Sequence, residues 1–72
     1  MITVETVENA AKNTLKLHCA DCKKVLKAEE EGLQPFTDED FLLFMGLAEL
    51  HVNHHPEHSP VIYVRKRKEA NT

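Results

Sequence analysis

The alternation of apolar and polar positions predicts strands in the first part of the chain. Residues 2–5 and 15–19 both alternate with a period of two, which is typical of half-buried strands. We expect these two segments to pair as an N-terminal β-hairpin, although no Asn-Gly or Asp-Gly dipeptide joins them. We expect residues 23–27 to form a third short strand that leaves the cysteines. The acidic segment 28–34, which is interrupted by a glycine, is expected to be a loop.

A second pattern predicts one main helix over about residues 38–54. Thr37 is a favourable N-cap, and Asp40 follows it at the spacing of a capping box. Phe36 and Phe41 occupy the two positions of a hydrophobic staple. Pro56 disfavours helical geometry at the residue before it, so the helix should end near residue 54 or 55.

The segment after the helix predicts a C-terminal strand over about residues 61–67. It begins with a β-branched and aromatic run without alternation, which indicates a central strand buried on both faces. The fold class is therefore α+β, with a β-hairpin, one main helix and a C-terminal strand. We expect a single domain over residues 1–68 and a disordered tail over residues 69–72, because a chain of 72 residues holds one domain.

Composition adds a need for extra stabilisation. The chain has no Trp, one Tyr and three Phe, and domains of this size are marginally stable without disulfides, a metal or a partner. The net charge of −3 argues against a protein that coats DNA. We find no signal-peptide pattern and no apolar run of the ~20 residues that span a membrane. An intracellular, cytoplasmic protein with reduced thiols is expected.

Two cysteines and a cluster of histidines form the candidate metal site. Cys19 and Cys22 make a Cys-x-x-Cys pair, which occurs both in zinc knuckles and in redox dithiols. The short segment after Cys22 does not predict the long helix that follows a thioredoxin-like pair. Four of the five histidines lie between residues 51 and 58, which favours a metal site.

The helical projection selects among these histidines. At about 100° per residue, His51 and His55 fall near the middle of the apolar face, one turn apart. The predicted ligands of a structural Cys2His2 zinc site are two thiolates and two imidazoles, from Cys19, Cys22, His51 and His55. His54 and His58 remain alternative ligands, which would apply if the helix stops early.

This pattern resembles the two-Cys two-His zinc fingers. A Cys-x-x-Cys knuckle precedes a helix that carries His-x-x-x-His, and Pro56 after the second histidine is similar to small zinc-finger proteins of phages and prokaryotes. The resemblance covers residues 19–56 and implies a zinc site. The spacer from Cys22 to His51 holds 28 residues, where DNA-reading fingers have about twelve. Acidic residues 38–40 begin the helix, so the resemblance does not imply classical DNA reading.

The expected function is a small zinc-binding module that acts as a protein-interaction or regulatory domain. Its candidate contact surfaces are the acidic residues 29–31 and 38–40, together with Leu42. The alternative is a nucleic-acid-binding, transcription-associated zinc finger that uses a basic segment, made of Arg65, Lys66, Arg67 and Lys68. We expect no enzyme, because an open zinc site would have only Glu57 as an obvious base, and a chain this short has little room for a substrate pocket.

Overall fold

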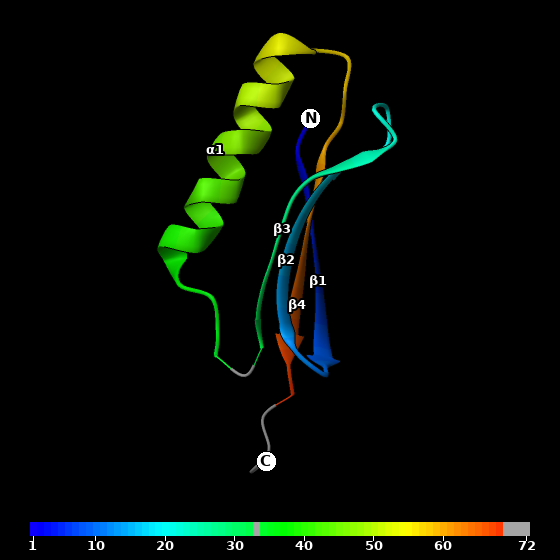
Figure 1. Cartoon of the computed structure of the whole chain (residues 1–72). Coiled ribbons are helices and arrows are strands. Elements are labelled where there is room, and N and C mark those ends of the chain that lie inside the picture. Colours follow the sequence, from blue (N-terminus) through cyan, green and yellow to red (C-terminus); the bar gives the residue numbers. More distant parts are fainter. Residues whose placement is uncertain (33, 69–72) are drawn as a thin grey trace.

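The protein is a four-stranded sheet covered on one face by one helix (Figure 1). A computed structural model describes residues 1–32 and 34–68, without the side chains of residues 31 and 32. Along the chain, the elements are β1 (Thr3–Ala10), β2 (Asn13–Cys19), β3 (Lys24–Gly32), α1 (Asp38–His54) and β4 (Val61–Arg67). The α+β class is confirmed, and so are the main helix and the C-terminal strand.

The order of the strands differs from the expected N-terminal hairpin. β1 and β2 follow each other closely, but β4 lies between them, parallel to β1 and antiparallel to β2. The backbone N–H of Arg67 donates to the side chain of Asn13 at 2.9 Å, which ties the end of β4 to the start of β2. Pairing of residues 2–5 with residues 15–19 was therefore a wrong prediction. Alternation identifies a strand but carries no information about its partner.

The hairpin that carries the cysteine knuckle is formed by β2 and β3. Their antiparallel pairing runs from Cys19 opposite Lys24 to Asn13 opposite Gly32. The loop expected over residues 28–34 is therefore a strand as far as Gly32. Glutamates are poor strand formers, but pairing with a neighbouring strand overrides such local preferences.

The hydrophobic core lies between α1 and the inner strands. Its fully buried apolar members are Leu15, Leu17, Phe44, Ala48 and Ile62. β4 has the expected inner position, but α1 covers only one of its faces, and Tyr63 on the other face is half-buried. The expectation that β4 is buried on both faces was therefore wrong.

The predicted start and end of α1 are confirmed. Thr37 Oγ1 accepts from the N–H of Asp40 at 3.2 Å, and the Asp40 carboxylate accepts from the N–H of Thr37 at 3.0 Å. At the other end, His55 is the C-cap with φ −135° and ψ 75°. This geometry is not helical, in line with the restriction on the residue before Pro56.

The C-terminal tail and the absence of a membrane span were also predicted from the sequence. The tail expected over residues 69–72 lies outside the described residues. In the part of the chain that is described, no helix is long and apolar enough to cross a membrane.

Candidate metal centre

Four side chains from different segments converge at one end of the sheet. Cys19 ends β2, Cys22 lies in the turn between β2 and β3, His51 lies in the last turn of α1, and His58 lies between α1 and β4. One ligand atom from each side chain lies within 4.8 Å of the other three. Figure 1 shows the β2–β3 turn and the segment after α1 at this same end. The fold therefore assembles a Cys2His2 cluster that is compatible with a metal ion.

The spacing of these atoms is close to that of a tetrahedral zinc site. Cys22 Sγ lies 3.6 Å from His51 Nε2 and 3.4 Å from His58 Nδ1. Cys19 Sγ lies 3.5 Å from His58 Nδ1, and the two nitrogens are 3.2 Å apart. Around a tetrahedral zinc ion, a sulfur and a nitrogen ligand would be about 3.6 Å apart, and two nitrogens about 3.3 Å apart. One four-coordinate ion fits these donors.

The turn after β2 brings the two cysteines together. The N–H of Lys23 donates to the carbonyl of Ala20 at 3.1 Å, which closes the turn. Lys23 has φ 58°, a left-handed conformation that is uncommon for residues other than glycine. The knuckle thus keeps an unfavourable backbone conformation beside the candidate site, as often occurs where a fold positions ligands.

Asp21 connects the knuckle to the segment that carries His58. Its carboxylate accepts from the N–H of Ser59 at 3.0 Å and lies 4.0 Å from Cys19 Sγ. Because Ser59 follows His58 directly, this hydrogen bond fixes the backbone of that histidine relative to the cysteines. Nothing in the sequence pattern singled out Asp21, since the contact joins residues that are far apart in the chain.

Burial favours the neutral forms of two donors. Desolvation raises the pKa of the Cys22 thiol, and the hydrogen bond and charge of Cys19 raise this pKa further. Desolvation also lowers the pKa of His51, with added repulsion from His55 and His58. A neutral imidazole is ready to bind a metal, whereas a thiol must first lose its proton. Metal binding is therefore expected to release protons.

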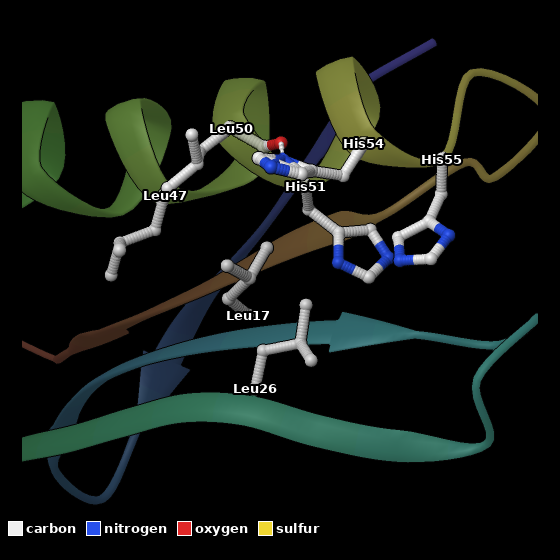
Figure 2. A pocket seen from close by; sticks show the side chains of 7 residues that line it. All are labelled: Leu17, Leu26, Leu47, Leu50, His51, His54 and His55. Atoms are coloured by element: carbon white, nitrogen blue, oxygen red, sulfur yellow. Dashed lines mark hydrogen bonds between the residues drawn. The ribbon is translucent and has the colours of Figure 1, made fainter.

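His55, the expected partner of His51, lies outside the four-residue cluster. Its ring stacks on that of His58, with centroids 4.7 Å apart and planes at 14°. Figure 2 shows it beside His51 at the end of the helix. The projection extended helical geometry to residue 55, but the chain leaves the helix there. The N–H of His58 then donates to the His55 carbonyl at 2.9 Å, in the turn that brings His58 to the cysteines.

His54, the other alternative ligand, is exposed and bonds locally. Its Nδ1 donates to the backbone carbonyl of Leu50 at 3.2 Å, the contact drawn in Figure 2. The structure therefore brings together Cys19, Cys22 and His51 as expected, with His58 as the fourth residue. The signal for His58 was present in the sequence, because Pro56 ends the helix and places His58 in the connection between α1 and β4.

An apolar pocket opens beside the cluster, between α1 and β3. Its volume is about 310 Å³, and Leu26, Leu47 and Leu50 are among the residues that line it (Figure 2). Leu26 comes from β3, and the other two leucines come from α1. His51 lies in the wall of the same pocket, so this apolar surface adjoins the candidate metal centre.

The basic segment at the end of β4 is divided between the two faces of the sheet. Arg65 lies opposite Thr14, on the uncovered face, two residues after Tyr63. Lys66 lines a hollow on the helix side together with Phe41 and Asp38. Contact of the four basic residues with nucleic acid stays a prediction. A nucleic-acid strand that lies on one face of the sheet would not contact both Arg65 and Lys66.

No protein-family model, curated protein or solved structure matches this chain. The resemblance to two-Cys two-His zinc fingers therefore rests on the Cys2His2 cluster and its near-zinc geometry.

Proposed function

We propose that the cluster binds one structural Zn²⁺ ion, which holds the end of α1 and the segment before β4 against the β2–β3 turn. The supporting observation is the spacing of two sulfur and two nitrogen donors at tetrahedral distances. This donor set suits zinc. The likeness to small phage and prokaryotic zinc fingers is part of the same proposal.

A structural role follows from the number of protein ligands. Four side chains fill a tetrahedral shell and leave no position for water or substrate. We therefore propose that the protein is not an enzyme. Since a preformed site rarely exists in an unfolded chain, zinc binding should add directly to the stability of the fold.

Native mass spectrometry with and without a chelator tests this proposal. We expect one zinc ion per chain, and loss of NMR chemical-shift dispersion when the chelator removes it. A purified, reduced protein that binds no zinc would contradict the proposal. Full dispersion after complete zinc removal would contradict the coupling of zinc to folding.

Around this centre, we propose a protein-interaction or regulatory module in a reducing, intracellular compartment. Support comes from the apolar pocket between α1 and β3 and from leucines on the helix surface. The exposed fractions of Leu42, Leu43 and Leu50 are 64%, 51% and 54%. Leu50 also lines the pocket, and an exposed apolar patch commonly marks a protein contact. A partner that binds the zinc-loaded protein and its Leu50→Glu variant equally well would contradict a role for this surface.

The second candidate function, nucleic-acid binding, is favoured by the uncovered face of the sheet. Lys16 Nζ lies 5.3 Å from the centroid of the Tyr63 ring, and Arg65 follows on the same face. An aromatic ring among cations can stack a base and attract phosphate. Fluorescence anisotropy with single-stranded oligonucleotides at low salt tests this function. Arg65→Glu should abolish binding, while Lys66→Glu on the opposite face should preserve it.

A further inference from the structure

We propose that two copies of this chain form a dimer by antiparallel pairing of their β3 strands. The inference rests on the proposed role as a protein-interaction module and names its partner as a second copy. β3 is an outer strand, paired with β2 on one side and with no described strand on the other. Such an edge presents unpaired backbone N–H and C=O groups that can bind another strand.

The order of charges along β3 is complementary to itself when reversed. Lys24 and Lys27 lie in the first part of the strand, and Glu29 and Glu30 follow them. Antiparallel pairing about the middle of the strand places Lys27 of one copy opposite Glu29 of the other, while Lys24 lies opposite Gly32. Directly opposed charges of unlike sign stabilise antiparallel strands, and like charges destabilise them.

The register is defined by a two-fold axis through Ala28, a small and exposed residue. Lys27 then lies opposite Glu29 of the second copy, and the reverse contact forms by symmetry. Both side chains are on the helix side, because their opposite residues in β2 are the buried Leu17 and Leu15. Within one chain they are already 3.4 Å apart and only about one-third exposed, at 32% and 33%. The dimer would join two such pairs into a cluster of four alternating charges.

The other outer strand lacks this property. The charged residues of β1 are Glu5 and Glu8. Pairing of two β1 strands would therefore bring acidic residues together. Charges of one sign protect an edge from pairing with itself. The self-complementary charges therefore favour β3 as the dimer edge. Because a two-fold interface uses the same edge of both copies, assembly stops at the dimer.

Apolar surface supports the same edge. Leu43, Leu47 and Leu50 follow one another on the flank of α1 by steps of four and three residues, and the last two line the pocket with Leu26. A strand added to β3 widens the floor of this pocket by about 4.8 Å. It would shield part of this apolar surface from water. β3 has nine residues, but register shifts in its pairing with β2 leave only residues 27–30 as a regular run around Ala28. The interface is therefore small, and we expect a dissociation constant on the order of 10–100 µM.

Sedimentation velocity of the zinc-loaded protein, from about 1 to 500 µM, tests the dimer. Lys27→Glu and Glu29→Lys should each weaken dimerisation about tenfold, because each change replaces two attractive contacts by two repulsive ones. The double variant should return to within about threefold of the original affinity, since every pair is again of unlike sign. Glu5→Lys in β1 is the matched control and should leave dimerisation unchanged. Circular dichroism and zinc content verify that each variant is folded.

Hydrogen exchange gives an independent readout. Amides of β3 should exchange more slowly as protein concentration rises, while amides of β1 should not change. A monomer at every concentration, a ladder of larger oligomers, or a double variant as weak as the single ones would overturn the dimer. A monomer that still holds one zinc ion would leave the metal proposal intact, which separates the two failures.

Discussion

The two ends of α1 are attached to the molecule by different means. At the start, the capping box of Thr37 and Asp40 completes the first turn, and Phe41 packs against the core. At the end, Ala48 is the last helix residue in the core cluster, and His51 then enters the metal cluster. Apolar packing tolerates small displacements, whereas metal ligands must hold fixed positions. One end therefore depends on ordinary packing, and we expect the other to depend on an ion.

The largest expected effect is a loss of zinc affinity on replacement of His58, compared with replacement of His55, on which its ring stacks. His58→Ala removes one of the four proposed ligands and should weaken zinc binding by more than about 100-fold, the upper range for residues outside the ligand set. His55→Ala removes only a stacked ring, so we expect less than about a tenfold change. Competition with a chelator of known affinity measures both. If His55→Ala were the more damaging change, the helical projection would have been the better guide to the ligands.

An intermediate effect should come from Asp21. Asp21→Ala removes the acceptor for the Ser59 N–H and should weaken zinc binding by about 10- to 100-fold, as such supporting contacts usually do. Asp21→Asn keeps an oxygen that can accept this hydrogen bond, so its zinc affinity should stay closer to that of the original protein. The same competition titration compares the two variants. Equal losses in both would show that the charge of Asp21 matters more than its hydrogen bond.

The smallest effect should appear at the opposite end of the helix. Thr37→Ala breaks the capping box and should lower the free energy of unfolding by about 1 kcal/mol, measured by urea denaturation with zinc in excess. Its apparent zinc affinity should fall by no more than about fivefold, the factor that about 1 kcal/mol contributes when zinc binding and folding are coupled, because the cap contacts none of the proposed ligands. A loss of zinc affinity as large as that of Asp21→Ala would mean that the two ends are not independent.

The same contrast explains what the sequence could predict. The limits of α1 depend on neighbouring residues, Thr37 and Asp40 at one end and Pro56 at the other, so local pattern was sufficient. The partner of β1 is β4, which lies far away in the chain. The full length of β3 depends on its pairing with β2, which overrides the poor strand preference of its glutamates. The metal cluster was predicted in part: Cys19, Cys22 and His51 could be selected from their spacing and from the helical projection. The choice between His55 and His58 depended on the path of the chain after the helix ends.

The inner position of β4 has a consequence for how the chain folds. β4 is the only described partner of β1, yet it is separated from it by the rest of the sheet and the helix in sequence. During synthesis β1 therefore emerges long before the strand that it needs, while β2 and β3 can form their hairpin early. Pairing between Thr3 and Val61 requires closure of a long loop, and such distant contacts slow folding. Completion of the sheet should be the late, slow step, with β1 the last strand to gain protection.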